Sequence, residues 1–449
     1  MQYRRDDTIA ALATAPGQGA VAIVRLSGPA AAAIASTLTG LEPRPRYAEL
    51  CTFRDADGRR IDQGLLLFFP APNSYTGEDV VELHGHGGRV VSDLLLARAY
   101  ALGARAAEPG EFTLRAFLND KLDLLQAEAV ADLVASGSST AARAAVRSLD
   151  GEFSSAVREL QAGLTALRVR IEAWLDFPDE ELPFDAGTES ISALDSLAAQ
   201  LDALSARARQ GSALRDGLSV AIAGPPNAGK SSLLNRLAGY DAAIVTDVPG
   251  TTRDALREHL TLGGLPITIV DTAGLREATD PVEQEGLRRT RMEVARADRV
   301  LWVADVREPL AAAVAAARAA LDPGVPFTLV HNKVDLAEGA GSAADIGGVP
   351  ALRISALTGA GLDLLTAHLQ ALAGFAPEAA GTFSARRRHL DALARAKRHM
   401  LAARVELGRA LELAAEELRG AQTALGELTG ELTSDDLLGE IFATFCIGK

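Results

Sequence analysis

The segment 217–237, GLSVAIAGPPNAGKSSLLNRL, constrains the fold of this chain more than any other stretch. Its apolar start predicts a buried strand, and its end has the leucine spacing of an amphipathic helix. Between them, Gly224 is followed after four residues by GKS, the spacing of a loop whose backbone N–H groups wrap phosphates at a helix N-terminus. Lys230 can then reach the β- and γ-phosphates, and the Ser231 hydroxyl can ligate Mg²⁺. Strand, loop and helix in this order predict a nucleotide-binding domain built on a parallel sheet.

Two later segments indicate which base the nucleotide carries. The stretch TLVHNKVDL has Asn332, Lys333 and Asp335 directly after an apolar strand. A carboxylate there can accept hydrogen bonds from both the ring N–H and the exocyclic amine of guanine, whereas adenine would leave it buried and unpaired. The stretch ISALTG, residues 354–359, follows the next strand and suits a backbone contact to the base oxygen. Together these segments predict guanine.

Two further segments predict groups around the γ-phosphate. The stretch IVDTAGLRE supplies Asp271 for the metal shell and Gly274 for a phosphate contact, and DVPGTTRD supplies Thr252 as a second metal ligand. Leu275 stands where Ras-type GTPases have the glutamine that orients the attacking water. Because leucine can neither donate nor accept a hydrogen bond, another polar group must take this role. The nearby acidic candidates are Glu277, Asp280, Glu283 and Glu285.

The sequence shows no obvious arginine finger, although Arg253 and Arg276 lie near these motifs. A monovalent cation could supply the missing positive charge if oxygen atoms surround it. Asn227 and the backbone of TDVPGTT, residues 246–252, could provide those oxygens. The alternative for Asn227 is a side chain that only stabilises the phosphate loop.

The composition and the hydrophobic periodicity of the sequence change along the chain and predict three structural parts. Residues 1–118 mix short apolar strands with Gly/Pro turns and one helix, which is typical of a small α+β domain. Residues 119–213 and 377–449 have apolar side chains at three- and four-residue spacing, which predicts long amphipathic helices. Residues 214–376 alternate strands with helices. The expected fold is therefore multidomain, α/β plus all-α: an N-terminal α+β domain, a discontinuous helical bundle and an inserted Ras-like P-loop GTPase domain.

Composition excludes some classes of function. A formal charge of −14 over 449 residues argues against a protein held on nucleic acid by a global positive field. The run 384–399, SARRRHLDALARAKRH, could still form a local basic stripe on a helix. Cys51 and Cys446 are too few for a disulfide framework and suit a reducing compartment. With no signal sequence and no apolar run long enough to span a bilayer, we expect a cytoplasmic protein with no membrane partner.

These motifs resemble those of the MnmE (TrmE) family of tRNA-modification GTPases. The same resemblance extends to three further stretches of this sequence: YTGEDVVELHGHGG (75–88), FLNDKLDLLQAEAV (117–130) and the terminal FCIGK. The resemblance covers essentially the whole chain. The GTPase motifs alone occur in many translational GTPases, and the combination with the N-terminal and terminal stretches is more specific. The implied enzyme is a GTPase activated by potassium-dependent dimerisation of its G domains.

The resemblance assigns the nucleotide and ion site residue by residue. It implies K⁺ ligation by Asn227, Thr246, Val248 and Thr251, through side chain or main chain, and Mg²⁺ ligation by Ser231 and Thr252. It implies catalytic roles for Lys230 and for Glu283, which would orient the attacking water. The implied GTP/GDP and ion contacts are Asn227, Ala228, Gly229, Lys230, Ser231, Ser232, Thr246, Asp247, Val248, Pro249, Gly250, Thr251, Thr252, Asp271, Thr272, Ala273, Gly274, Asn332, Lys333, Val334, Asp335, Ser355, Ala356 and Leu357.

The resemblance also implies an N-terminal domain that binds a tetrahydrofolate derivative, 5-formyl- or methylene-tetrahydrofolate, as one-carbon donor. The matching positions are Arg25, Glu82, Lys121 and Lys449. A carboxylate suits the donor–acceptor edge of a pterin, and cationic groups suit its anionic glutamate tail.

The terminal stretch FCIGK poses a separate question. As a prenylation box CIGK is poor, since Gly448 and Lys449 occupy its last two positions. The resemblance favours a tail that folds back to the folate pocket and brings Cys446 to the one-carbon unit, as nucleophile, acid or packing residue. His84 and His86 could be a metal pair, but a turn lining the folate site is the favoured interpretation, because no cysteine or third histidine is nearby.

The implied function is tRNA modification. With a flavoprotein partner, MnmG (GidA), which carries FAD and would join a homodimer of this chain in a heterotetramer, such a protein adds a carboxymethylaminomethyl or aminomethyl group at C5 of the wobble uridine of certain tRNAs. GTP hydrolysis would gate a conformational change. Two alternatives stay open from the sequence: a GTP-dependent switch that docks on RNA during ribosome assembly, and a folate-storing or folate-sensing protein.

Overall fold

The computed structural model describes residues 7–176, 188–240, 257–271, 294, 296–337, 341–376, 381–431 and 435–448. The chain forms two compact units. The first consists of Met1–Ala131, Ser148–Ala198 and Arg395–Lys449, and the second of Asp132–Arg147 and Ala199–Ala394. The domain boundaries expected after residues 118, 213 and 376 stay predictions.

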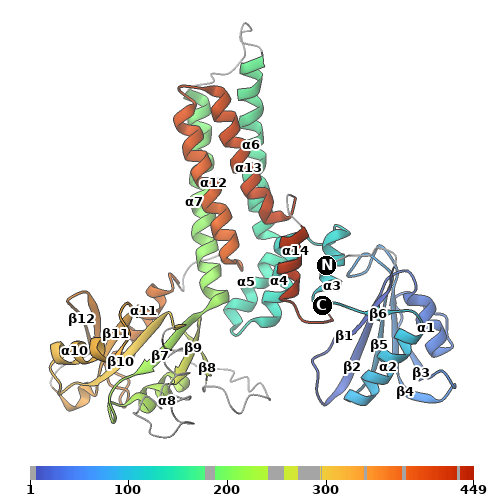
Figure 1. Cartoon of the computed structure of the whole chain (residues 1–449), viewed down its shortest axis with the longest axis horizontal. Coiled ribbons are helices and arrows are strands. Elements are labelled where there is room, and N and C mark those ends of the chain that lie inside the picture. The colour runs from blue at the N-terminus through green and yellow to red at the C-terminus, as the bar shows by residue number, and fades with distance from the viewer. Residues whose placement is uncertain are drawn as a thin grey trace. The chain divides into compact units, whose positions relative to one another are not determined.

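A six-stranded sheet forms the N-terminal part of the first unit (Figure 1). Its elements are β1 (Ile9–Leu12), β2 (Gly19–Ser27), α1 (Ala31–Thr39), β3 (Glu49–Arg54), β4 (Arg60–Phe69), β5 (Val80–Gly87), α2 (Arg89–Ala101), β6 (Arg105–Ala106) and α3 (Glu111–Leu118). The strands lie in the order β3-β4-β5-β2-β1-β6, and only β1 and β6 pair in parallel. Helices α1 and α2 pack on the sheet over a core that includes Phe53, Leu83 and Leu95. This part is the α+β fold that the sequence predicts.

Long helices lie before and after the α/β part in the chain. They are α4 (Leu124–Ala135), α5 (Ser139–Leu149), α6 (Glu152–Asp176), α7 (Thr188–Asp216), α12 (Arg387–Glu406), α13 (Leu411–Thr429) and α14 (Asp435–Ala443). Helices α6 and α13 lie side by side, and Arg168 of α6 donates a hydrogen bond to Gln422 of α13. Helix α6 also approaches α7 closely at Gly163, where an added Cβ would lie 2.5 Å from Leu197. Segments before and after the α/β part therefore pack together, as a discontinuous bundle requires.

A seven-stranded sheet forms the centre of the second unit. Its elements are β7 (Leu218–Ala223), α8 (Lys230–Tyr240), β8 (Arg257–Leu262), β9 (Leu265–Asp271), β10 (Arg299–Asp305), α10 (Leu310–Ala320), β11 (Phe327–Asn332), the 3₁₀ helix η1 (Val334–Leu336), β12 (Ser342–Ile346), β13 (Val349–Arg353) and α11 (Leu362–Leu372). The order is β12-β13-β11-β10-β7-β9-β8, with antiparallel pairs at the two edges only. The loops that follow β7, β10, β11 and β13 leave the same edge of the sheet, because these strands are parallel.

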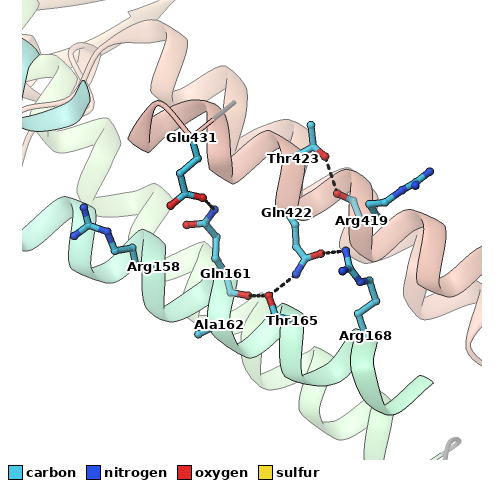
Figure 2. A pocket seen from close by; sticks show the side chains of 9 residues that line it. All are labelled: Arg158, Gln161, Ala162, Thr165, Arg168, Arg419, Gln422, Thr423 and Glu431. Atoms are coloured by element: carbon cyan, nitrogen blue, oxygen red, sulfur yellow. Dashed lines mark hydrogen bonds between the residues drawn. The ribbon is translucent and has the colours of Figure 1, made fainter. Parts of the chain in front are cut away.

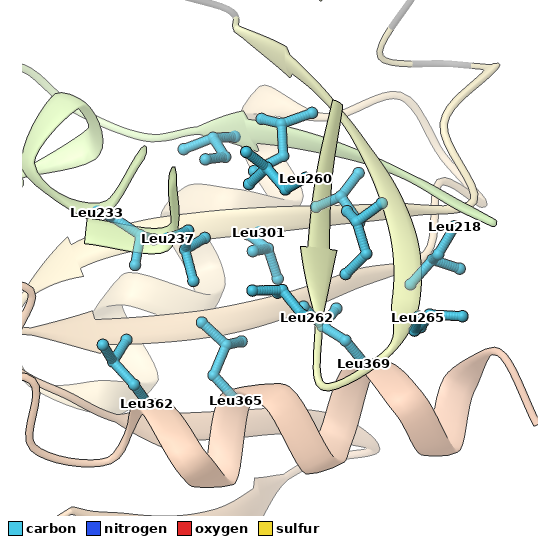
Figure 3. Close-up of a cluster of buried hydrophobic side chains, with 14 of the residues drawn as sticks. Leu218, Leu233, Leu237, Leu260, Leu262, Leu265, Leu301, Leu362, Leu365 and Leu369 are labelled. Atoms are coloured by element: carbon cyan, nitrogen blue, oxygen red, sulfur yellow. The ribbon is translucent and has the colours of Figure 1, made fainter. Parts of the chain in front are cut away.

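Leucine side chains dominate the core on one face of this sheet (Figure 3). Leu233 and Leu237 of α8 and Leu365 and Leu369 of α11 are buried there together with Leu301 of β10. On the sheet's other side, α10 contributes Ala and Val side chains to a second buried cluster. Burial on both faces explains why these strands read as continuous apolar runs rather than as alternating ones.

Asp132, near the end of α4, holds the two connections of the α/β part together. Its carboxylate accepts hydrogen bonds from Arg215 Nε at 2.9 Å, from Arg386 Nη2 at 2.8 Å and from Ser384 Oγ at 2.6 Å. Arg215 lies in the last turn of α7, just before β7, whereas Ser384 and Arg386 directly precede α12. One buried carboxylate, only 8% exposed, therefore ties the chain that enters the sheet to the chain that leaves it.

The sequence predicted the long elements better than the short ones. The expected strands and helix of the N-terminal part correspond to β2, β4, β5 and α2, and the expected long helices to α4 and α6. The two-residue β6 and the edge strand β12 have no apolar alternation, because β6 is too short and four of the five β12 residues are exposed. Among the described residues, no helix is long and apolar enough to cross a membrane.

Gly211 of α7 provides a test of this packing. An added Cβ there would lie 1.8 Å from the carbonyl oxygen of Phe383, so Gly211→Ala must push α7 away from the segment before α12. We expect the free energy of unfolding to fall by about 1–3 kcal/mol, measured by thermal denaturation of the full chain. Gly439→Ala in α14 is the control, because its Cβ would meet nothing within 4 Å and alanine favours a helix. Equal stabilities of the two variants would contradict the close approach.

Candidate functional site

The phosphate loop connects β7 to α8, and its glycines occupy positions that side chains cannot. Gly224 and Gly229 have φ values of 142° and 98°, in the region that favours glycine. An added Cβ would lie 2.1 Å from the Val303 carbonyl oxygen at the first position and 2.3 Å from Asn332 Nδ2 at the second. Lys230 Nζ donates hydrogen bonds to the carbonyl oxygens of residues 224 and 225, each at 2.9 Å. The loop has the tight backbone that phosphate binding at a helix N-terminus needs.

Asn332, the last residue of β11, joins the phosphate loop to the base segment. Its side-chain Nδ2 donates to the Ala228 carbonyl oxygen at 2.9 Å, and its Oδ1 accepts from the Ala356 backbone N–H at 2.9 Å. The residue is 2% exposed. Because both halves of a buried amide are hydrogen-bonded, the two loops are held at a fixed separation.

The predicted guanine-binding carboxylate is also held in place. Ser355 Oγ donates a hydrogen bond to Asp335 Oδ1 and accepts one from the Thr358 backbone N–H at 3.1 Å. Ala356 is buried whereas Leu357 is 72% exposed, so the segment turns outward between them. The structure thus brings the NKVD and SAL stretches together at the sheet edge next to the phosphate loop.

Arg236 is a site residue that the sequence reasoning missed. It lies in α8, and its Nε donates to the Ala356 carbonyl oxygen at 2.9 Å while its Nη2 donates to that of Leu357. Both carbonyls of the base segment are therefore capped by a cation from the helix that follows the phosphate loop. Only the packing of α8 reveals this contact, since an arginine on an amphipathic helix is unremarkable by itself.

Several predicted site residues fall outside the described residues. These are Thr246, Asp247, Val248, Pro249, Gly250, Thr251, Thr252, Thr272, Ala273, Gly274, Glu283 and Lys449. The roles assigned to these residues stay predictions. Asp271 ends β9, next to β7 and thus beside the phosphate loop, and its role in the metal shell also stays a prediction.

A second polar cluster lies on the N-terminal sheet. Arg25 of β2 and Glu82 of β5 are register partners, and Arg25 Nε donates to Glu82 Oε1 at 2.9 Å. The other oxygen of Glu82 lies 3.1 Å from His84 Nε2. The side chains of Arg25 and Glu82 are 22% and 16% exposed, so they remain in reach of a ligand.

The carboxyl-terminal tail reaches this cluster. The Gly448 carbonyl oxygen accepts a hydrogen bond from Arg25 Nη1 at 3.5 Å, and an added Cβ at Gly448 would lie 2.2 Å from the Leu12 carbonyl oxygen. The Cys446 carbonyl oxygen accepts a hydrogen bond from the Gly110 backbone N–H at 3.3 Å, and the Cys446 residue itself is exposed. The tail therefore lies against Arg25, whereas a folate pocket at this place and the approach of Cys446 to a one-carbon unit stay predictions.

Aromatic side chains surround the Arg25 guanidinium. Its carbon lies 5.7 Å from the Tyr75 ring centre and 5.8 Å from that of Phe112. Burial raises the pKa of the Tyr75 hydroxyl, which is 2.8 Å from Thr113 Oγ1. Lys121 Nζ donates a hydrogen bond to the Pro72 carbonyl oxygen at 3.0 Å. The structure brings Arg25, Glu82 and Gly448 into contact and leaves Lys121 without a bond to any of them among the described contacts.

The histidines of β5 do not form a pair. His84 contacts Glu82, while His86 Nδ1 lies 2.8 Å from Asp62 Oδ1. Among the residues that the structure describes, no three His, Cys, Asp or Glu side chains come together as a metal site. The metal-pair alternative has no support in this geometry.

Known protein families match both parts of this chain. Residues 8–121 match the family model described as GTP-binding protein TrmE N-terminus, and residues 124–446 match the one described as MnmE helical domain. The tRNA modification GTPase MnmE of Alkalilimnicola ehrlichii is 56% identical over 444 residues, 98% of this chain and 99% of that protein. This chain belongs to the MnmE family of tRNA modification GTPases.

Further relatives have the same extent. The tRNA modification GTPase MnmE of Nitrosococcus oceani is 56% identical over 449 residues, 99% of this chain and 98% of that protein. Among solved structures, the G domain of the T. maritima FeoB iron transporter is 26% identical over 35% of this chain and 98% of that chain. Its TM-score of 0.27 is too low to support an inference. Membership of the MnmE family confirms the multidomain fold class with N-terminal, helical and GTPase parts.

Three residues of the basic run 384–399 contact carboxylates in this MnmE-family chain. Arg386 pairs with Asp132, and Arg395 pairs with Glu427. His399 Nδ1 lies 2.7 Å from Glu417. These contacts favour the interpretation of the run as an ion-paired helix surface rather than as a nucleic-acid track.

A polar groove lies between α6 and α13, and the arginines that line it also have carboxylate partners (Figure 2). It has a volume of about 450 Å³ and a hydrogen-bonded ladder that connects Gln161, Thr165 and Gln422. The arginines at its walls lie beside carboxylates, in the pairs Arg158–Asp123, Arg168–Glu172 and Arg419–Glu416. The groove therefore lacks the excess positive charge that a polyanion needs.

Arg236 offers a test of the base segment. Arg236→Ala should weaken GDP binding about tenfold, because a hydrogen bond from a charged donor contributes about 1.5–3 kcal/mol. Titration with a fluorescent guanine nucleotide measures the change. Arg318→Ala is a matched control, since Arg318 Nη2 also donates to a backbone carbonyl, that of Gly347, at 3.0 Å but away from the base segment. Equal affinities of the two variants would show that the Arg236 contact has no role in binding.

Proposed function

We propose that this protein hydrolyses GTP and, with a flavoprotein partner of the MnmG (GidA) type, adds an aminomethyl-type group at C5 of the wobble uridine of certain tRNAs. The observation that carries the proposal is the near full-length match to tRNA modification GTPases, joined to two separate polar sites in one chain. One site is the guanine-nucleotide edge of the seven-stranded sheet. The other is the Arg25–Glu82 cluster that the tail covers.

The proposed ligand of the second site is a tetrahydrofolate derivative that supplies one carbon. Glu82 offers acceptor oxygens to the donor edge of a pterin, and the Arg25 guanidinium offers donors to acceptor atoms beside it. The tail backbone at Gly448 lies against Arg25, which supports a closing role for residues 445–448. Cys446 is exposed two residues before Gly448, and its chemical role stays open.

At the nucleotide site, the described residues orient rather than react. Asn332 fixes the spacing of the phosphate and base loops, Asp335 can accept from the guanine edge, and Lys230 can neutralise phosphate charge. Mg²⁺ held by Ser231 and Thr252 and K⁺ held around Asn227 would add positive charge at the phosphates. We assign the water-orienting role to Glu283, and we infer that hydrolysis gates a conformational change.

The proposed assembly is a homodimer of this chain that joins the partner in a heterotetramer in the cytoplasm. FAD would belong to the partner, and tRNA is the shared substrate. The pairing of the groove arginines with carboxylates supports tRNA binding that depends on the partner.

The decisive experiment is a wobble-nucleoside profile. Cells that lack this chain should lose C5-modified wobble uridines in specific tRNAs, and re-expression of the chain should restore them, as measured by mass spectrometry of tRNA nucleosides. An unchanged profile would exclude base modification and favour an RNA-docking GTP switch or a folate-sensing protein.

Potassium dependence is tested with the purified full chain. GTP turnover should rise tenfold or more when K⁺ replaces Na⁺, since about 1.4 kcal/mol of extra transition-state stabilisation is a factor of ten. Asn227→Ala should lose most of this increase, whereas Asn235→Ala, on the exposed side of α8, should keep it. Equal turnover in both salts would remove the cation from the proposal.

A further inference from the structure

Asp305 ends the strand that lies between β7, which leads to the phosphate loop, and β11, which leads to the NKVD stretch. It is the last residue of β10, and its register partner in β11 is Asn332. The next residue after Asn332 is Lys333 of the NKVD stretch. Because β10 and β11 are parallel neighbours, the Asp305 carboxylate emerges at the same sheet edge as Lys333.

The carboxylate of Asp305 is bonded from two sides. Lys333 Nζ lies 2.8 Å from its Oδ2. Arg307 donates Nε at 2.9 Å to Oδ1 and Nη2 at 2.7 Å to Oδ2, and its backbone N–H donates at 3.1 Å to Oδ1. Led by the hydrogen bonds from the Arg307 side chain, these contacts hold the pKa of Asp305 far below its usual range. The group is therefore an anion at any physiological pH.

Lys333 connects this anion to the phosphate loop. Its Nζ also donates to the Asn227 carbonyl oxygen at 2.6 Å, so one ammonium bridges a strand end and the phosphate loop. Lys333 and Asn227 both have positive φ values, 69° and 58°, which are uncommon for residues other than glycine. The Lys333 ammonium therefore joins two positions of unusual backbone conformation to the Asp305 carboxylate.

We propose that Asp305 is a positioning residue for guanine-nucleotide binding: it anchors the Lys333 ammonium so that Lys333 is ordered before the base arrives and stays tied to Asn227. A free lysine side chain has about 2 kcal/mol of rotamer entropy to lose. Anchoring it in advance lowers the cost of binding. The inference rests on the proposed guanine-nucleotide site, which GDP binding by the unchanged chain tests separately.

The test is Asp305→Asn in the full chain. Asparagine keeps the size of the side chain and removes its charge, so the charge-assisted bond to Lys333 is weakened. We expect the KM for GTP and the dissociation rate of a fluorescent GDP analogue to rise about tenfold, with kcat changed less than twofold, the pattern for lost uniform binding. Asp305→Glu, which keeps the anion, should recover most of the affinity.

The matched control is Asp298→Asn, just before the opposite end of the same strand. Asp298 accepts a backbone N–H from Ser219 at 2.8 Å and lies at the amino end of β10, away from the nucleotide edge. Its replacement should leave KM within twofold. If Asp298→Asn and Asp305→Asn raise KM equally, Asp305 acts only through the stability of β10, and the proposal is wrong.

A double-mutant cycle separates anchoring from other effects. In a Lys333→Met background, Asp305→Asn should change GDP affinity less than twofold, because the anchored group is gone. A tenfold effect in that background would overturn the proposal. Failure of the unchanged chain to bind GDP at all would instead overturn the proposed function.

Discussion

The buried side-chain amide of Asn332 is the contact on which the nucleotide site depends. Its two polar atoms bond to Ala228 in the phosphate loop and to Ala356 in the base segment, 104 and 24 residues away in the chain. If either loop moved alone, one half of this buried amide would be left unpaired at a cost of about 1–3 kcal/mol. Around it, Arg236 donates to the base segment, and Asp305 holds Lys333, which donates to the phosphate loop. The site is therefore a network held from the sheet edge rather than a set of independent loops.

The sheet makes that edge rigid because it is covered on both faces. Leucine side chains of α8 and α11 pack on one face and α10 on the other, so the parallel strands cannot shift without opening a core. The chain enters and leaves the seven-stranded sheet through segments that Asp132 joins with three hydrogen bonds. A change at the nucleotide edge that moved β7 relative to α12 would act on these three hydrogen bonds, which gives the proposed gating a physical location within the unit.

The N-terminal cluster follows a different principle. Here a cross-strand ion pair, Arg25 with Glu82, is set by the register of β2 and β5, and the chain terminus supplies a backbone carbonyl to it. Residues more than 400 positions apart thus share one site. The Gly448 contact with Leu12 leaves no space for a side chain, which explains in physical terms why the penultimate residue of this tail is glycine.

The sequence by itself determined the α/β, α+β and helical parts, the guanine-nucleotide motifs and the family, because these depend on local periodicity and on spacing within single loops. It did not reveal Asp305, Arg236 or the Asp132 connection, since each acts across strands or helices whose pairing no local pattern encodes. The short strands β6 and β12 were not predicted for a related reason. Their residues show no alternation of apolar and polar side chains, and only hydrogen bonds to neighbouring strands define them. Tertiary structure decided which charges meet, because a carboxylate's partner is chosen by sheet register and helix packing rather than by its neighbours in the chain.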